Sequence, residues 1–393
     1  MGRDCLIIDG GKVITPAETF RGGRVVIVGS KIAAIGPKAK IAAPAGARRI
    51  SARGKLVLPG LIDAHTHGFC GTDCGEGVEA VLNMRRSLPR FGVTGFLPTM
   101  ICPAGRNLQR QLDDVRAAAK ADCGGAQVLG VHLEGPYFNR DFGAFPERHA
   151  SVPAARAQEQ MISRFKGFVK IVTLSPELKG AFGFIRRLRA AGIVAAIGHS
   201  GADVDCLTKA ADAGAQHVIH LFNAMRRRSR EELGCEWPGL SDHALVEDRL
   251  TAEVIADGIH VKPTLLKLAV RAKGVDRVVL VTDSMKPAGM PAGIYELRDG
   301  LSVVSDGTSC RTRDGGLAGS LLTLNRAVVL MTRLAGVTIE QAVQMATLNP
   351  ARLIGVQRRK GSLKEGRDAD ICIADEQMEV QVAIVKGRVV HEL

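Results

Sequence analysis

Short apolar runs rich in Val, Ile and Leu recur through the middle of the chain, separated by stretches with apolar residues at helical spacing. Such alternation is typical of parallel βαβ units, in which each buried strand is followed by an amphipathic helix. We predict eight strands from these runs. In chain order they are VLPGLIDAHTH, VTGFLPTM, AQVLGVHLEG, VKIVTLSPE, IVAAIGHS, AQHVIHLFNA, LTAEVIADGIH and VDRVVLVTDS.

The spacing of these strands favours a closed barrel. The seven steps from His67 to Asp283 average roughly 31 residues, close to the length that one βαβ unit needs. Eight such units close into a TIM-type barrel of the α/β class. A doubly wound open sheet is the alternative, but it favours a Gly-rich phosphate-binding fingerprint after the first strand, which this sequence lacks.

The two ends of the chain have a different residue pattern. Residues 1–55 and 355–393 contain short Val- and Ile-rich segments between Gly-rich turns, which predicts strands rather than helices. We expect the two ends to pair into one small β domain, with residues 56–354 forming the barrel.

Polar side chains gather where the predicted strands end. In a (β/α)8 barrel, the carboxyl ends of the strands meet at one rim, where active sites are built. The titratable residues that we single out at this rim come from six of the eight strands. They are Asp63, His65, His67, His132, Glu134, His199, His217, His220, Asp257, His260 and Asp283.

His65 and His67 are two residues apart on a strand, so both rings point to the same face and can bind one metal together. Taken alone, such a pair is more often two polar residues in a loop. The further ligand types at matching strand ends favour the metal site. Glu134 also ends an apolar strand, where its carboxylate can bridge two cations. Its alternative role is helix capping or a salt bridge.

His199 and His220 follow apolar runs, and each is either a metal ligand or a buried core histidine. His217 and His220 should face opposite sides of a strand, so we expect only one of them inside the barrel. We choose His220 because it is nearer the carboxyl end. Imidazole and carboxylate ligands together favour Zn²⁺ or Fe²⁺ over Mg²⁺.

Asp283 ends the run VVLVTD. Beside a dication, a buried aspartate stays ionised, so it can take a proton from water and return it to a leaving group. We predict that Asp283 is the catalytic acid and base and that it also lies among the metal ligands. The alternative is an N-cap for the next segment.

Several segments together carry a family resemblance, although each alone is weak evidence. In order they are LPGLIDAHTHG, HLEGPYFN, TLSPE, GHSGA, HLFNAM, PGLSDHAL, IADGIHV, VTDSMKPAG, LAGSLLTLNRAV, ATLNPARLIGV and KGSLKEGRDADICI. Over nearly its whole length, the chain resembles the N-acetylglucosamine-6-phosphate deacetylase family of the amidohydrolase superfamily. The resemblance implies a distorted (β/α)8 TIM-type barrel with a small β-sandwich domain formed by both chain ends.

The resemblance also implies roles for residues. Glu134, His199 and His220 would hold the main divalent metal, with Zn²⁺ the first expectation and Fe²⁺ the second. Because this chain keeps His65 and His67, one or two metals per chain are expected, with Glu134 bridging. Substrate-binding positions match Asn223, Ala224 and His260. The implied reaction removes the N-acetyl group of an amino sugar phosphate, releasing acetate.

Two departures from the family pattern concern the substrate. Phe145 stands where the family has a histidine that reaches the sugar, and Glu236 and Trp237 stand near the usual phosphate-binding arginine. We expect Arg226 and Arg227, in the basic run that ends at Arg230, to take over phosphate binding, because guanidinium binds phosphate through two hydrogen bonds. The alternative is a solvated basic loop.

Composition and charge narrow the possible partners. The net charge is +13, but the basic residues are scattered and aromatics are only 4%, which argues against a nucleic-acid-binding protein. Nine cysteines form no CxxC pair, which favours a reducing compartment. We find no signal peptide and no apolar run long enough to span a membrane. We therefore expect a cytoplasmic enzyme, which the resemblance suggests is a homodimer.

Other members of the superfamily are the competing functions. A cyclic-amide hydrolase usually has a carboxylated lysine at the end of strand four, but Lys170 lies too early in that strand. A nucleobase deaminase is disfavoured by the EGP and HLFNAM segments. An amidohydrolase acting on another N-acetylated or cyclic amide without a phosphate remains the alternative.

Overall fold

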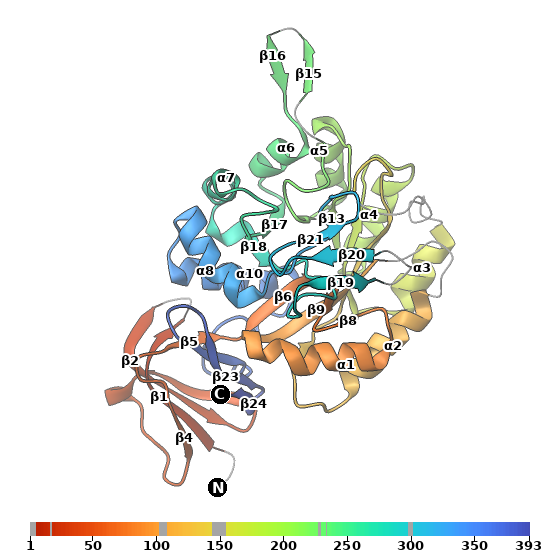
Figure 1. The fold of residues 1–393 in the computed structure, drawn as a ribbon. Coiled ribbons are helices and arrows are strands. Elements are labelled where there is room, and N and C mark those ends of the chain that lie inside the picture. Colours follow the sequence, from red (N-terminus) through yellow and green to blue (C-terminus); the bar gives the residue numbers. More distant parts are fainter. Residues whose placement is uncertain are drawn as a thin grey trace.

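The computed structural model describes residues 5–15, 18–101, 108–143, 155–226, 229–232, 234–297 and 302–393. Its centre is a barrel of eight parallel strands (Figure 1). Each strand pairs with the next in chain order, and a parallel bridge between Thr66 and Ser284 joins the last strand region to the first. The strands are β6 (Leu61–Thr66), β9 (Val93–Ile101), β11 (Val131–Tyr137), β12 (Val169–Leu174), β13 (Val194–Ile197), β14 (His217–Val218), β17 (Thr251–Ile255) and β18 (Val278–Val281).

These eight strands coincide with the eight predicted ones, so the predicted barrel is confirmed. All residues of β13 and β18 are buried. Strands covered on both faces read as continuous apolar runs, which explains why the sequence pattern identified them.

Helices cover the outside of the barrel (Figure 1). They are α1 (Val78–Ser87), α2 (Leu108–Lys120), α3 (Ala155–Arg164), α4 (Ala181–Ala190), α5 (Val204–Ala213), α6 (Leu240–Val246), α7 (Pro263–Lys273), α8 (Leu324–Ala335), α9 (Ile339–Met345) and α10 (Leu348–Leu353). Local signals set their ends. The Asp203 side chain accepts a hydrogen bond from the Cys206 amide at the start of α5, and Gly214 ends that helix with a left-handed φ of 108°. No helix in the described part of the chain is both long and apolar enough to cross a membrane.

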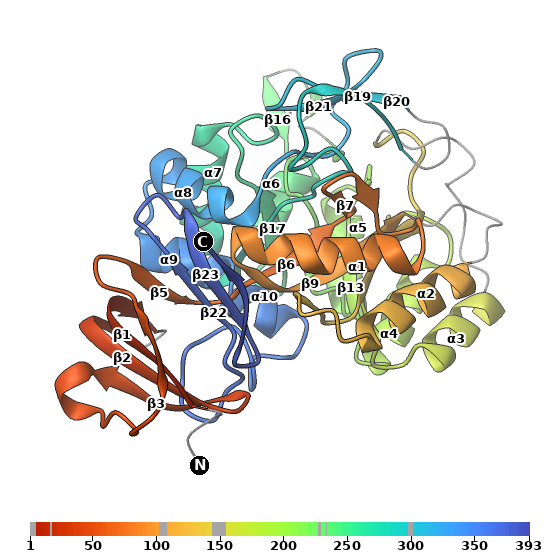
Figure 2. The same cartoon turned by 60° about the horizontal axis from the view of Figure 1, so that its bottom comes forward.

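A second, strand-rich domain combines the two ends of the chain, as predicted (Figures 1 and 2). Its strand order is β24-β23-β22-β5-β1-β2-β3, and β4 also pairs with β1. The antiparallel pairing of β5 with β22 joins the two ends directly. The strands are β1 (Cys5–Ile14), β2 (Thr19–Val28), β3 (Lys31–Pro37), β4 (Arg48–Ser51), β5 (Leu56–Pro59), β22 (Ile371–Ala374), β23 (Val380–Val385) and β24 (Arg388–Glu392).

Apolar packing and buried ion pairs hold this domain together. Buried side chains from both ends, such as Ile8 and Ile373, share one core. Asp368 is 4% exposed and accepts from Lys31 Nζ at 2.6 Å and Arg359 Nη2 at 2.9 Å. The boundaries at residues 55 and 355 stay predictions, although β5 lies in this sheet.

Further short strands lie beside the eight strands of the barrel. A hairpin of β15 (Ser229–Glu232) and β16 (Cys235–Trp237) projects away from it near α6 (Figure 1). Residues 235–237 of this hairpin are exposed. The remaining strands are β7 (Gly68–Phe69), β8 (Thr72–Asp73), β10 (Gln127–Val128), β19 (Gly293–Glu296), β20 (Ser302–Ser305) and β21 (Cys310–Thr312).

Candidate active site

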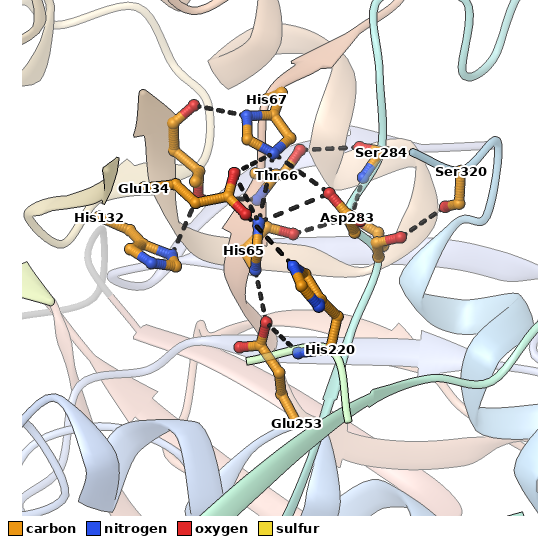
Figure 3. A network of polar contacts seen from close by, with 12 residues as sticks. His65, Thr66, His67, His132, Glu134, His220, Glu253, Asp283, Ser284 and Ser320 are labelled. Carbon is orange, nitrogen blue, oxygen red and sulfur yellow. Dashed lines mark hydrogen bonds and ion pairs between the residues drawn. The ribbon is translucent and has the colours of Figure 1, made fainter. Parts of the chain in front are cut away.

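Glu134 lies between two pairs of histidines at the carboxyl end of the barrel. Its Oε1 is 2.9 Å from His199 Nε2 and 3.3 Å from His220 Nε2. Its Oε2 is 3.1 Å from His67 Nε2 and 3.6 Å from His65 Nε2 (Figure 3). Each carboxylate oxygen thus faces one histidine pair. We call Glu134 with His199 and His220 the first half-site, and Glu134 with His65 and His67 the second half-site.

The four imidazoles are oriented so that Nε2 can bind a metal. Nδ1 lies 3.1 Å from the Phe142 carbonyl in His199, 3.2 Å from the Asn223 carbonyl in His220 and 3.0 Å from the Thr99 carbonyl in His67. In His65, Nδ1 lies 2.5 Å from Glu253 Oε1. Carbonyl and carboxylate oxygens only accept hydrogen bonds, so each Nδ1 carries a proton, and each ring in its neutral form directs its Nε2 lone pair into the site.

These donor sets fit divalent cations. In each half-site, the three ligand atoms lie within 4.8 Å of one another and all three residues are buried. Facing nitrogens come close, at 3.1 Å between His199 and His220 and 3.2 Å between His65 and His67. Lone pairs directed at one point repel unless a cation or proton lies between them. A mixed imidazole and carboxylate set suits Zn²⁺ or Fe²⁺.

The carboxylates and imidazoles of the site shift one another's pKa values. Burial opposes a charge on Glu134, but His65 and His67 outweigh it and hold the pKa of Glu134 well below its usual range. Burial likewise opposes protonation of His67, yet the carboxylates of Glu134 and Asp283 raise the pKa of His67 to about 9. A cation in the site would compete with protons for the same nitrogens, so its binding would release protons.

Asp283 faces the second half-site. Its Oδ1 is 3.1 Å from His67 Nε2 and 3.5 Å from His65 Nε2. Although burial opposes its ionisation, the two histidines lower the pKa of Asp283. The Asp283 amide donates to the His65 carbonyl, and the Ser320 amide donates to the Asp283 carbonyl. The carboxylate is thus ionised and held at a fixed place on the rim, as a proton acceptor requires.

Backbone strain gathers at the same residues. His199, His220 and Asp283 have left-handed φ values of 49°, 25° and 48°, respectively. Residues other than glycine rarely adopt this region, and such conformations persist where the surrounding structure enforces them. Ala224 is similar, with φ 51°. The turns that end β13, β14 and β18 therefore aim these side chains at the barrel axis.

The structure corrects our reasoning about His217 and His220. Strand β14 ends at Val218, so His220 is not on the strand and the alternation rule does not apply to it. Both side chains are buried, and His217 Nε2 reaches Glu253 Oε2 at 3.1 Å. His220 nevertheless remains the member of the pair that faces Glu134.

Sequence reasoning missed Glu253, which lies within β17 and is fully buried. The signal was a single carboxylate inside the apolar run LTAEVIA. His132 was recognised at a strand end but given no role. Its ring packs edge-on against His65 at 4.7 Å, and its Nε2 lies 2.7 Å from Thr173 Oγ1. Burial lowers the pKa of His132 to about 3, so this ring is neutral.

Asn223 joins His260 to His220, because its carbonyl lies 3.2 Å from His220 Nδ1 and its side chain contacts the His260 main chain. His260 Nδ1 is 2.6 Å from Asp257 Oδ2, and Asn223 Nδ2 donates to the His260 carbonyl. Among the described residues, His260 Nε2 and Asn223 Oδ1 are buried without a hydrogen-bond partner. Such atoms are rare in native proteins and indicate a place for a polar ligand.

Only some of the residues expected to bind or border the substrate phosphate lie in the described part of the chain. The Arg226 main chain is fixed, since its amide donates to the Ser200 carbonyl and its carbonyl accepts from the Leu240 amide. Arg227 and Phe145 lie outside the described residues. Trp237, near the expected family arginine, is 46% exposed.

Comparison with known proteins places this site in a class. A model of the amidohydrolase family matches residues 56–390. The chain therefore belongs to the amidohydrolase family, whose fold agrees with the barrel and the strand-rich domain described above.

Curated relatives narrow the class. The chain is 35% identical to the N-acetylglucosamine-6-phosphate deacetylase of Bacillus subtilis, over 98% of this chain and 97% of the relative. It is 36% identical to the N-acetylgalactosamine-6-phosphate deacetylase of Escherichia coli O157:H7, over 85% and 87% of the two chains. Within the amidohydrolases, it belongs with the N-acetylglucosamine-6-phosphate deacetylases.

Solved structures agree. An N-acetyl-D-glucosamine-6-phosphate deacetylase variant from Mycobacterium smegmatis, in complex with N-acetyl-D-glucosamine-6-phosphate, has a TM-score of 0.86 and 30% identity, covering 98% of each chain. The enzyme from Thermotoga maritima has a TM-score of 0.84 and 28% identity, covering 98% of this chain and 100% of that one.

Proposed function

We propose that this chain hydrolyses the N-acetyl group of N-acetylglucosamine-6-phosphate, or of a close N-acetyl amino sugar phosphate, to give the amino sugar phosphate and acetate. The observation that carries the proposal is Glu134 between two histidine pairs with Asp283 alongside. The named relatives support the same reaction, and they include enzymes for both the gluco and the galacto sugar.

A divalent metal is the cofactor in this proposal, with Zn²⁺ preferred, Fe²⁺ the alternative, and one or two ions per chain. Glu134, His199 and His220 would hold the first ion, and His65, His67 and Glu134 the second. A cation there would polarise the acetyl carbonyl and would make the attacking water more acidic.

Asp283 moves the proton in the proposed reaction. It takes a proton from water as the water oxygen forms a bond to the acetyl carbon. It then gives that proton to the sugar nitrogen as the carbon–nitrogen bond breaks, so one residue acts first as base and then as acid. Its lowered pKa suits the first step, because the carboxylate must start ionised.

His260 and Asn223 would orient the substrate. Their unpartnered Nε2 and Oδ1 atoms can meet the polar groups of the acetamido sugar, and the left-handed turn at Ala224 brings main-chain groups to the same place. Arg226 and Arg227 would bind the phosphate. We further propose a homodimer in the cytoplasm.

Acetate release tests the function. Purified protein of measured metal content would be given N-acetylglucosamine-6-phosphate, N-acetylgalactosamine-6-phosphate and the two sugars without phosphate. We expect turnover of at least one phosphorylated sugar, with kcat/KM at least tenfold above its unphosphorylated counterpart. Release from none of the four would exclude the proposed reaction. Equal rates with and without phosphate would leave a deacetylase but remove the phosphate role of Arg226 and Arg227.

A further inference from the structure

Glu253 joins the two half-sites from below the rim. It lies within β17, it is fully buried, and its carboxylate points into the barrel toward His65 and His220 (Figure 3). Oε1 is 2.5 Å from His65 Nδ1 and accepts from the His220 amide at 3.0 Å. Oε2 is 3.1 Å from His217 Nε2. One side chain therefore contacts a histidine of each half-site and a third histidine behind them.

His65 differs from the other three histidines of the site. Nδ1 of His67, His199 and His220 faces a main-chain carbonyl, which no side-chain substitution removes. Nδ1 of His65 faces only the Glu253 carboxylate. A partner of this kind fixes the ring tautomer and raises the basicity of the nitrogen that binds metal.

We infer that Glu253 is a positioning residue that holds His65 with its proton on Nδ1 and thereby sets the metal affinity of the second half-site. The inference rests on the proposed metal-dependent function. The His220 amide contact restrains the first half-site only through the main chain, and the Nδ1 atom of His220 has its own carbonyl. Loss of Glu253 should therefore weaken the second half-site more than the first.

The contacts of the two carboxylate oxygens separate two substitutions. In E253Q, the amide oxygen must stay at the Oε1 position, because the His220 amide can only donate there. His65 then keeps an acceptor for its Nδ1 proton, while the negative charge is lost. In E253L, the acceptor is lost as well. We expect a small effect from E253Q and a large one from E253L.

The test measures metal retention rather than turnover. Metal-loaded wild type, E253Q and E253L would be dialysed against rising chelator concentrations, and the zinc retained per chain would be measured. The H67N variant, which lacks one ligand of the second half-site, identifies which equivalent of bound zinc belongs to that half-site. We expect E253L to lose that equivalent at about 10- to 100-fold lower chelator concentration, the usual effect of removing such a partner, with E253Q between it and wild type.

D63N is the matched control. Asp63 is as deeply buried, at 1% exposure, but it contacts His65 only through the main-chain amide, at 3.3 Å, and otherwise bonds Thr282. We expect D63N to retain zinc within about threefold of wild type. Equal losses in D63N and E253L, or wild-type retention in E253L, would overturn the inference. So would a wild type that binds only one equivalent.

Two further measurements separate the inference from a folding defect and from failure of the proposed function. If E253L does not fold, proton NMR of zinc-loaded wild type and E253Q still tests whether Glu253 holds His65 with its proton on Nδ1. The short charged contact at 2.5 Å should give a downfield imidazole N–H resonance that moves upfield in E253Q. Its absence in wild type would contradict the inference. Acetate release by wild type is measured alongside, so the deacetylase proposal stands or falls independently.

Discussion

Replacing Asp283 by Asn tests the chemical core of the proposed mechanism. The substitution keeps size and shape but removes the group that accepts a proton. The turn should survive, because it is fixed by main-chain bonds from the Asp283 amide to the His65 carbonyl and from the Ser320 amide to the Asp283 carbonyl, at 2.9 and 2.8 Å. Any loss of rate then reports on the carboxylate rather than on the fold.

The expected loss follows from the two roles of this side chain. General acid or base catalysis contributes about 10²- to 10⁴-fold to a rate. Because Asp283 serves in both steps, we expect kcat to fall about 10³- to 10⁴-fold, which corresponds to about 4–5.5 kcal/mol of activation free energy. KM should change only a few-fold, since binding of the sugar rests on other residues.

The assay is acetate release under saturating substrate, with the metal content of each preparation measured in parallel. S284A is the control, because Ser284 Oγ only links Thr66 and Gly68 near the same turn, at 2.7 and 2.9 Å. We expect it to lose less than tenfold. If D283N retained more than a tenth of the wild-type kcat at full metal content, the proton-transfer role would be refuted.

Three further predictions concern other parts of the molecule. In D257N, the amide oxygen should stay with the Ile259 and His260 amides that now bond Oδ1, which turns its NH₂ toward His260 Nδ1 and forces the other tautomer. We expect kcat/KM to fall about 5- to 150-fold, from a mismatch of about 1–3 kcal/mol, with metal content unchanged; wild-type kinetics would exclude a role for this pair. In D368N, stability should fall. Burial opposes the charge on Asp368, but Lys31 and its other cationic partners lower its pKa from 3.8 to about 2. This stabilisation, up to roughly 2 kcal/mol, is present above about pH 3.8 and is lost as the pH falls through about 2. Urea titrations of wild type and D368N should therefore differ at pH 7 and converge near pH 2, and a constant gap would contradict the assignment. F96A should cost about 3–5 kcal/mol by the same measurement, because Phe96 is fully buried in the barrel core, and a loss below 1 kcal/mol would show that the core closes around the cavity.

The fold was largely predictable because its signals are local. Strands covered on both faces must be apolar throughout, so the runs that became β13 and β18 stood out from the helical stretches around them. The barrel rule then placed the strand ends at one rim. His65 and His67 were recognised because strand alternation turns both rings to one face, and their Nε2 atoms do lie 3.2 Å apart.

Reasoning from strand periodicity failed where the chain leaves the strand. His220 stands in a turn with φ of 25°, two residues beyond the end of β14, so its direction is set by the turn. The same holds for His199 and Asp283, whose strained φ values no sequence pattern revealed. The types and chain positions of these residues were readable from the sequence, but the directions in which their side chains point were not.

The sequence by itself determined the parallel barrel, the pairing of the two chain ends and the set of candidate ligands, because hydrophobic periodicity and strand-end position act over a few residues. Only the tertiary structure decided which oxygen of Glu134 faces which histidine pair, and that Glu253 lies behind His65. Those relations join strands that are far apart in the chain, and closure of the barrel creates them. The role of a carboxylate in the middle of an apolar strand becomes clear only from the side chains that closure of the barrel places next to it.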